Sequence, residues 1–319
     1  MLHKLCLIAI VVLLYPHAAL AIELYVDNEL GSDDLDGRSR VTSVSLLAGP
    51  VRTITRALQI AHAGDRINLT NNRTPYRESI TIFGGNNGVG VDGAFTIEGN
   101  GATLNGSFSV PRKAWENYRG DIFRFTPEHA AFGQLFLDAR PAKRRYLARP
   151  GAIPNLNPLE WCLADGMIYF RVESDKLPDE YPLTYAAQTV GITLYQVRGV
   201  LINDLIVEGF QLDGINAHDR VTDCVLDGVI ARGNGRAGVA VGGASDVRLI
   251  HCILGDNGDA QLLTDGPSKT FVRSSKLLDN TAPPLLRRGG EVWEEEKADA
   301  PDADAPAAEE TKAKKAAVR

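Results

Sequence analysis

Cysteine is scarce in this sequence, and no long apolar run occurs beyond the first residues. Four cysteines occur in 319 residues, and Cys6 lies in an N-terminal segment that we expect to be removed. Cys162, Cys224 and Cys252 then remain. An odd number of cysteines excludes a closed disulfide framework, although an exported protein could still form one bridge.

A strong excess of basic charge is also absent. The chain has 34 basic and 40 acidic residues and a formal net charge of −6, which argues against a general nucleic-acid binder because that class needs a net basic face. The 44% of hydrophobic residues excludes disorder of the whole chain. The 31 glycines indicate many tight turns rather than long helices. The length fits one large domain or two ordinary ones.

Residues 1–21 have the pattern of a secretory signal peptide. Lys4 lies in a short basic region, an apolar run covers residues 5–14, and Ala19-Leu20-Ala21 matches a cleavage site. The apolar run is too short to span a bilayer, and no later segment approaches the length required. The sequence therefore predicts an exported protein without a membrane span, which is secreted, periplasmic or held at the cell surface.

The C-terminal residues 291–319 form a low-complexity segment of Ala, Glu, Asp, Lys and Pro. Their nine acidic and five basic residues give a net charge of −4, and we expect a disordered, solvated extension. Loss of Lys4 with the signal peptide changes the net charge of the chain from −6 to −7, so residues 22–290 carry −3. The expected folded domain is therefore close to neutral.

A repeat of 23 or 24 residues runs through residues 200–289. Segments that begin at Ile202, Leu226, Leu249 and Val272 align with like residues at like positions, and a fixed period of this size indicates a solenoid. Leucine-rich repeats require a leucine pattern that is absent, and helical repeats require longer amphipathic runs than these short β-branched stretches. The repeat therefore predicts an all-β protein, a right-handed parallel β-helix with three short strands per turn.

Further columns of the alignment support this prediction. They are Leu205, Val229, Cys252 and Ser275; Ile215, Val239, Leu262 and Leu285; and Phe210, Asn234, Asn257 and Asn280. The three asparagines would form a ladder of hydrogen-bonded side-chain amides at a turn. Cys224 and Cys252 fall in apolar columns, so we expect small buried hydrophobic residues there rather than a reactive pair.

The flanking parts of the chain complete this architecture. Apolar residues at helical spacing within residues 53–63 predict an α-helical cap on the N-terminal end, where an exposed strand edge would invite aggregation. Strands are expected at residues 66–69, 79–83 and 95–98. Residues 107–190 interrupt the repeat, and Asp165-Gly166 between apolar runs predicts a hairpin there. We expect an inserted β-hairpin lobe beside a single β-helix domain over residues 22–290.

Short motifs near the N-terminus carry a family signal. They are Tyr25-Val26-Asp27, Gly31-Ser32-Asp33, Ala63-Gly64-Asp65, Tyr76-Arg77-Glu78 and Gly99-Asn100-Gly101-Ala102-Thr103-Leu104. These motifs resemble the opening of pectate-lyase-like right-handed β-helix proteins, a superfamily that includes chondroitinase-B-like lyases, alginate lyases and mannuronan epimerases. With the repeat, the resemblance covers residues 24–106 and 190–282. It implies the fold, while one scaffold of this kind hosts several chemistries and some members that only bind.

The segment Gly214-Ile215-Asn216-Ala217-His218-Asp219 supplies the catalytic candidates. It is similar to a Gly-Phe-Asp-Pro-His-Glu segment of mannuronan epimerases whose His lies in the active site. Ala217 stands in place of the Pro, and Gly242 stands one coil further on, where the resemblance implies an acidic partner. The same column continues to Asp265 and Arg288.

This column could hold a sugar ring. His218 and Asp265 would lie about 10 Å apart, with the glycine leaving a concavity between them. Removal of the C5 proton of a uronic acid needs a base, an acid and a cation, and His218, Asp219, Asp265 and Arg288 are residues of these types. The alternative interpretation is that His218 and Asp219 only form a polar turn.

A basic run with one tyrosine is the candidate for substrate binding. It contains Arg140, Lys143, Arg144, Arg145, Tyr146 and Arg149. The run could receive an anionic glycan because it stands out against an acidic chain. The alternative is a solvated loop or a set of ion pairs.

Three aspartates near the N-terminus suggest a Ca²⁺ loop. Asp33, Asp34 and Asp36 precede Gly37, but this segment lacks the distal bidentate acid of an EF-hand. A turn is the simpler interpretation of the segment, and no other cofactor is evident from the sequence.

The sequence as a whole predicts a monomeric exported protein that binds or modifies an extracellular acidic polysaccharide. Modification would be β-elimination or C5-epimerisation of a uronate, as in polysaccharide lyases and epimerases. The alternative is a non-catalytic β-helix that binds carbohydrate or serves as a cell-surface structural protein. Gly242, in the place of an acid, supports that alternative.

Overall fold

The structure is a computed structural model, and it describes residues 21–43, 47–84, 86, 88, 93–128 and 133–295. The expected signal peptide up to residue 20 and the expected tail from residue 296 onward lie outside the described residues. Within the described residues, no helix is both long enough and apolar enough to cross a membrane.

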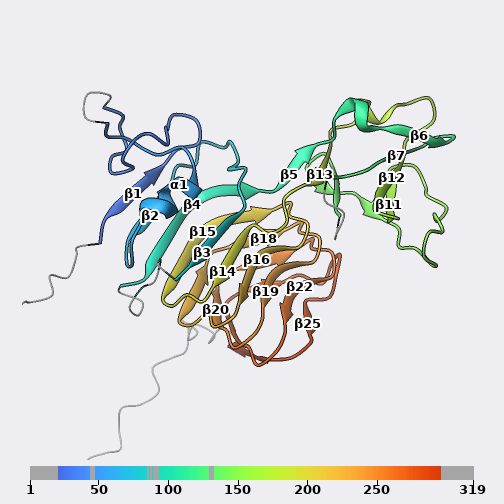
Figure 1. Cartoon of the computed structure of the whole chain (residues 1–319). Helices are drawn as coiled ribbons and strands as arrows, with labels where there is room; N and C mark the ends of the chain where they lie inside the picture. Colours follow the sequence, from blue (N-terminus) through green and yellow to red (C-terminus); the bar gives the residue numbers. More distant parts are fainter. Residues whose placement is uncertain are drawn as a thin grey trace, which may run out of the picture.

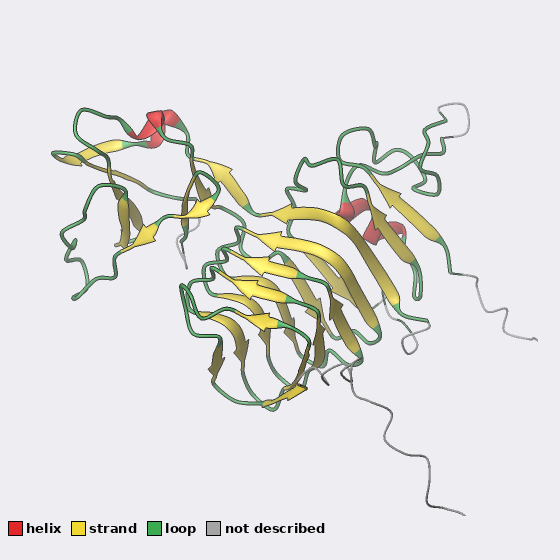
Figure 2. Ribbon diagram, turned by 180° about the vertical axis from the view of Figure 1, so that it is seen from behind, coloured by secondary structure: helices red, strands yellow, loops and turns green. Residues whose placement is uncertain are grey.

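Two sheets of parallel strands form the body of the molecule (Figure 1). The larger sheet has eleven strands, which are β1 (Glu23–Val26), β2 (Arg66–Leu69), β4 (Phe95–Asn105), β15 (Val200–Glu208), β17 (Cys224–Asp227), β18 (Ile230–Arg232), β20 (Asp246–Ile250), β21 (Ile253–Gly255), β23 (Lys269–Arg273), β24 (Lys276–Leu277) and β26 (Glu291–Glu295). The smaller sheet has six strands, which are β3 (Ile80–Phe83), β14 (Ile192–Tyr195), β16 (Asp213–His218), β19 (Ala237–Val241), β22 (Ala260–Thr264) and β25 (Leu285–Arg287). From β14 onward the chain passes alternately between the two sheets, and Figure 2 shows their strands stacked side by side. The chain is mostly β, as predicted.

The register of the strands matches the alignment of the repeat. Ile202 pairs with Leu226, Leu226 with Leu249, and Leu249 with Val272 in the larger sheet. The smaller sheet pairs the members of a second predicted column, which are Ile215, Val239, Leu262 and Leu285. All these side chains except Leu285 are buried in one continuous core between the sheets. The apolar columns are therefore confirmed as inward-facing rows.

Each coil turns at residues with a positive φ angle, and these residues recur at the same places. One place is occupied by Asp204, Gly228, His251 and Ser274, a second by Gly209, Gly233 and Asp256, and a third by Asp219, Gly243 and Gly266. Residues other than glycine, asparagine and aspartate rarely adopt this left-handed backbone conformation. The spacing of the glycines and aspartates in the repeat therefore follows the spacing of its turns.

The asparagine ladder forms between two of the predicted members and is altered at the third. The backbone N–H and the Nδ2 of Asn234 both donate to Oδ1 of Asn257, at 2.9 and 3.1 Å. Asn257 then donates to Oε1 of Gln261 at 2.8 Å, and Gln261 donates to Oδ1 of Asn280 at 3.1 Å. The side chain of Gln261 thus connects Asn257 to Asn280, which is exposed on the last coil.

The predicted N-terminal helix is α1 (Ile54–Ile60). The Thr53 hydroxyl accepts a hydrogen bond from the Arg56 N–H at 3.0 Å and caps the first turn. The Glu78 carboxylate accepts from the N–H groups of Ile54 and Thr55, at 2.8 and 2.9 Å. Ile54 and Ala57 are buried in the main core together with residues of β1 and β2, so the helix packs at the N-terminal end of the larger sheet.

Residues between β4 and β14 form a lobe beside the stacked coils (Figure 1). A four-stranded sheet contains β5 (Ser107–Ser109), β8 (Leu135–Leu137), β9 (Arg140–Pro141) and β13 (Leu183–Ala186). A five-stranded sheet contains β6 (Glu116–Arg119), β7 (Ile122–Phe125), β10 (Lys143–Arg144), β11 (Glu160–Ala164) and β12 (Met167–Arg171). Two 3₁₀ turns, η2 (Arg112–Ala114) and η3 (Pro178–Glu180), connect these strands. The predicted hairpin is confirmed, because β11 and β12 pair antiparallel around Asp165 and Gly166.

The C-terminal boundary differs from the prediction, because Glu291–Glu295 forms β26 and pairs in parallel with β23. The register places Lys269 opposite Glu291 and Arg273 opposite Glu295, so opposite charges lie side by side. The Trp293 ring stacks on Phe271 with centroids 4.7 Å apart. An acidic composition that suggests a solvated tail is therefore compatible with a strand when the neighbouring strand is basic.

Candidate functional site

A row of six residues follows the outer face of the smaller sheet, and it contains three of the four predicted catalytic residues. Phe83 pairs with Tyr195 and Tyr195 with His218. The pairing of Ala217, Val241, Thr264 and Arg287 places Gly242, Asp265 and Arg288 next in line. We call this set the His218 row; it consists of Phe83, Tyr195, His218, Gly242, Asp265 and Arg288.

The aromatic members of the row are open to solvent. Phe83 is 59% exposed and Tyr195 is 36% exposed. The ring centroids of Tyr195 and His218 lie 5.2 Å apart in an edge-on arrangement. Phe83 and Tyr195 were not among the sequence candidates, although each ends its strand at the position at which His218 ends β16. A repeat alignment extended to β3 and β14 would have identified both.

Gly242 leaves a gap in the row between His218 and Asp265. A Cβ atom on Gly242 would meet only the Cβ of Asp265, at 4.0 Å. Asp265 Oδ1 accepts a hydrogen bond from the Gly266 N–H at 2.8 Å. Asp219 follows His218 in the chain and lies outside the row, with its carboxylate 3.7 Å from His218 Nδ1.

A hollow adjoins the row at its aromatic end. It has a volume of about 630 Å³, and its lining includes Gln196, Asp219 and Arg220. Gln196 and Asp219 are the chain neighbours of Tyr195 and His218. A ligand that lies over the Tyr195 and His218 rings could therefore extend one substituent into this hollow.

A group of carboxylates and arginines that the sequence analysis did not identify lies where β16, β19 and β22 begin, whereas the row lies where these strands end. Asp213 is completely buried and accepts hydrogen bonds from Arg236 and from Asn216. Burial raises the pKa of the Asp259 carboxyl, while Arg144, Arg288 and Arg236 act against that rise. Arg144 of the lobe and Arg288 of the row therefore act on the same carboxylate.

Most of the predicted basic run is engaged within the lobe. Lys143 Nζ lies 3.0 Å and Arg145 Nε 3.6 Å from the carboxylate of Glu160, which is almost fully buried. The Arg144 guanidinium packs over the rings of Tyr146 and Trp161, 4.9 and 5.1 Å from their centroids. These contacts agree with the ion-pair alternative for Lys143 and Arg145.

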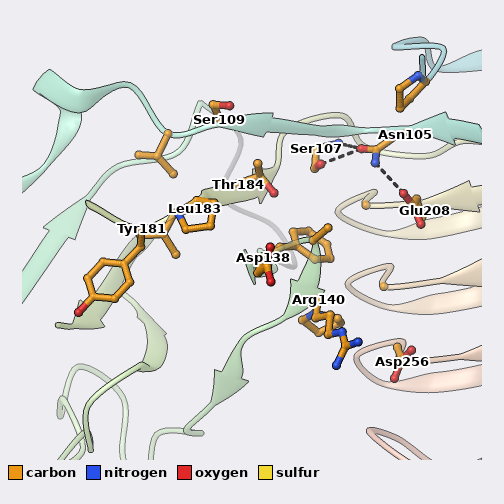
Figure 3. A pocket seen from close by; sticks show the side chains of 18 of the residues that line it. Asn105, Ser107, Ser109, Asp138, Arg140, Tyr181, Leu183, Thr184, Glu208 and Asp256 are labelled. Atoms are coloured by element: carbon orange, nitrogen blue, oxygen red, sulfur yellow. Dashed lines mark hydrogen bonds between the residues drawn. The ribbon is translucent and has the colours of Figure 1, made fainter. Parts of the chain in front are cut away.

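Two arginines of the run remain available to a ligand. Among the described residues, the Arg140 and Arg149 side chains have no ion-pair or hydrogen-bond partner. Arg140 lines a cleft of about 1060 Å³ between the lobe and the coils (Figure 3). Tyr146 is 63% exposed. Arg140 therefore lines this cleft, whereas Lys143, Arg144 and Arg145 make their contacts within the lobe.

The aspartates of the candidate Ca²⁺ loop accept hydrogen bonds from backbone N–H groups, as expected for a turn. Asp33 Oδ1 accepts from the N–H groups of Arg52 and Thr53, each at 2.9 Å. Asp36 Oδ1 accepts from the Arg38 N–H at 3.0 Å. In the part of the chain that the structure describes, no group of three or more His, Cys, Asp or Glu residues could hold a metal ion.

The three remaining cysteines are buried and free. Burial raises the pKa of the Cys162, Cys224 and Cys252 thiols to about 11. A thiol with such a pKa is protonated at neutral pH, so these residues are not nucleophiles. The prediction that Cys224 and Cys252 are buried hydrophobic residues is confirmed.

Comparisons with known proteins found two solved structures of similar shape. One is a structure of XylC with xylose, at 12% identity and a TM-score of 0.43, which covers 86% of this chain and 70% of that chain. The other is a glycoside hydrolase, at 10% identity and a TM-score of 0.36, which covers 86% of this chain and 96% of that chain. No family model and no curated protein matches the chain. Values this low do not place the chain in a family.

Proposed function

We propose that the protein is an exported right-handed parallel β-helix that binds an acidic polysaccharide along the His218 row. The observation that carries the proposal is the register of the row, which sets two exposed aromatic rings, an imidazole, a gap, a carboxylate and a guanidinium on successive strands. Adjacent strands are about 4.8 Å apart, so the row extends over about 24 Å. An extended chain of several sugar units matches this length.

Each part of the row suits a different part of such a chain. The apolar C–H face of a pyranose can pack on the exposed rings of Phe83 and Tyr195. Arg288 is exposed and, among the described side chains, has no ion-pair or hydrogen-bond partner, so it is available to a sugar carboxylate. The gap at Gly242 leaves room for one ring between His218 and Asp265.

The same residues favour modification of a uronate as the activity of the row. In β-elimination, a base removes the C5 proton, the C4–O bond breaks with its electron pair on oxygen, and an acid protonates that oxygen. In C5-epimerisation, a proton leaves one face of C5 and another arrives at the opposite face. His218 would be the acid or base, assisted by Asp219 and Asp265, because an imidazole can exchange protons near neutral pH. Arg288 would stabilise the negative charge that forms on the carboxylate.

A binding-only function is the second candidate, and the gap at Gly242 supports it. The nearest carboxylate in the row is Asp265, two strands from His218, while Asp219 lies in the following turn. His218 and Asp265 would have to act on the same sugar ring from this distance. The acid that the family resemblance implies beside His218 is replaced by Gly242. Binding needs no such pair.

The test measures binding and chemistry on the same samples. The full chain is incubated with alginate, pectate and chondroitin, and affinity electrophoresis, unsaturated-product absorbance and the C5-epimer ratio are recorded. We expect retardation by at least one polymer and loss of any product in His218→Asn. The matched control is His251→Asn, because His251 is an exposed histidine in the turn after β20 of the larger sheet and pairs with Asp227. Binding without product would establish the second candidate, and no binding to any polymer would disprove the proposal.

A further inference from the structure

The cleft between the lobe and the coils is a second concave site, separate from the His218 row. Its lobe side comes from β5, β8, β9, β13 and the two 3₁₀ turns, and its body side comes from the coil ends at Arg77, Asn105, Glu208, Arg232 and Asp256. Its volume of about 1060 Å³ is at the upper end of the range for ligand pockets. The row lies on the smaller sheet, whereas the body-side strands of the cleft belong to the larger sheet.

The two walls of the cleft are held in place by direct contacts. The ring of Phe136 lies against Gly233, so that a Cβ atom at Gly233 would be 3.0 Å from it. Arg77 donates hydrogen bonds to the Ser107 carbonyl and to Asn105 Oδ1. Asn105 also donates to Glu208 at 2.9 Å (Figure 3). A cleft built in this way is formed before a ligand arrives.

The charges in the cleft balance. Its lining has four arginines, Arg77, Arg112, Arg140 and Arg232, and four carboxylates, Asp138, Asp179, Glu208 and Asp256. Glu208 and Arg232 form an ion pair at 2.7 Å. Among the described residues, the side chains of Arg112, Arg140, Asp138 and Asp179 have no hydrogen-bond or ion-pair partner, which leaves two charges of each sign. A highly charged ligand of either sign therefore gains no net attraction from this lining.

The available groups suit a ligand that is rich in hydroxyls. Figure 3 shows Asp138 and Arg140 extending from the lobe into the space in front of Glu208 and Asp256. A carboxylate accepts from a sugar hydroxyl and a guanidinium donates to one, and both hydrogen bonds are strengthened by the charge. Ser107, Thr184 and the rings of Trp115 and Tyr181 add hydroxyls and apolar surface.

We propose that this cleft binds an uncharged oligosaccharide, independently of the acidic chain proposed for the His218 row. The proposal rests on the balanced charge, the unpartnered Asp138 and Arg140 and the preformed walls. It does not require the function proposed for the row to be correct, since no residue is shared between the two sites.

The experiment is calorimetric titration of the full chain with hexasaccharides of equal length. Cellohexaose and mannohexaose are the neutral probes, and hexagalacturonate is the acidic one. We expect a neutral probe to bind, and Asp138→Asn to weaken that binding by roughly tenfold through loss of a charge-assisted hydrogen bond. Asp175→Asn is the matched control, because Asp175 is an exposed lobe aspartate that shares the positive φ angle of Asp138, at 63° and 53°.

The outcomes separate this proposal from the one for the row. Affinity for the neutral probe that is unchanged in His218→Asn and falls by roughly tenfold in Asp138→Asn supports the cleft site whatever the row does. An equal loss of affinity for the neutral probe in Asp138→Asn and Asp175→Asn would overturn the proposal for the cleft. Tighter binding of hexagalacturonate than of the neutral probes in the cleft, or no binding of any neutral probe, would overturn it as well.

Discussion

Asp213 of β16 has no exposed surface, and its two carboxylate oxygens are held by Nε and Nη2 of Arg236, which lies one coil further along the chain. The hydrogen bonds to Asp213 raise the pKa of Arg236 above its usual range. The pair lies where the turn of the asparagine ladder leads into the smaller sheet. It therefore ties two coils together where β16 and β19 begin, at the opposite end of β16 from His218.

Removal of Asp213 is expected to destabilise the fold. Asp213→Ala leaves the largely buried Arg236 without its carboxylate, and we expect the free energy of unfolding to fall by about 2–3 kcal/mol. Urea denaturation followed by circular dichroism measures this change. The control is Asp223→Ala, because Asp223 pairs with Arg198 at the surface and such pairs contribute about 1 kcal/mol or less. Equal effects of the two substitutions would contradict the prediction.

The asparagine ladder predicts a graded response along the coils. Asn257 is fully buried and makes hydrogen bonds to Asn234, Ala231 and Gln261. Asn257→Ala leaves several buried polar groups unpaired, so we expect it to lower the free energy of unfolding by about 3 kcal/mol. Asn280→Ala, at the exposed end of the ladder, should cost less than about 1 kcal/mol. A larger effect at Asn280 than at Asn257 would contradict the structure.

The pH dependence of stability should reveal the environment of Glu160. The Asn157 N–H and Lys143 hold the pKa of the Glu160 carboxyl at about 2, below the ordinary value of about 4.3 in an unfolded chain. The stabilisation from the ionised group is therefore complete above about pH 4.3 and is lost as the pH falls towards 2. We expect Glu160→Gln to reduce the melting temperature at pH 7 and to flatten its decline between these two pH values.

Differential scanning calorimetry across this pH range measures the effect. Glu116→Gln is the matched control, because Glu116 is an exposed lobe carboxylate that pairs only with Arg124 among the described residues. Its stability profile should parallel that of the parent protein. If Glu160→Gln also gives a parallel profile, the Glu160 carboxylate does not have the depressed pKa described above.

Local periodicity made much of the fold predictable. The columns of Ile202 and Ile215 could be identified because inward positions repeat in every coil, and helix α1 could be predicted from the apolar spacing within residues 53–63. The cleft was not predictable in this way. Arg77, Asp138 and Asp256 line it from distant parts of the chain, and no spacing in the sequence relates them.

The basic run illustrates a second limit of the sequence. Its charges suggested an anion site, but Glu160, which neutralises Lys143 and Arg145, lies on the next strand of the lobe. Strand pairing within an irregular insertion follows no repeat, so the partner of each cation could not be assigned. The row of His218, Gly242 and Asp265, in contrast, followed from counting coils.

Gly242 provides the sharpest test of the row, because stability and binding should respond in opposite ways. Its backbone has no positive φ angle, and a Cβ atom there meets only Asp265, at 4.0 Å. Gly242 follows β19, and a side chain there meets no backbone clash, so Gly242→Val should raise the free energy of unfolding by about 0.5–1 kcal/mol, because valine leaves the unfolded chain less conformational freedom than glycine does. The valine fills the gap between His218 and Asp265, so affinity for the acidic polysaccharide should fall by about tenfold or more.

Affinity electrophoresis and urea denaturation of Gly242→Val measure these two effects on one sample. Thr193→Val is the control, because Thr193 pairs with Asn216 one strand away and lies outside the row. It should leave the affinity unchanged. Undiminished binding by Gly242→Val would show that the sugar chain does not enter the gap. Loss of both stability and binding would instead mean that the backbone after β19, rather than the ligand, requires the glycine.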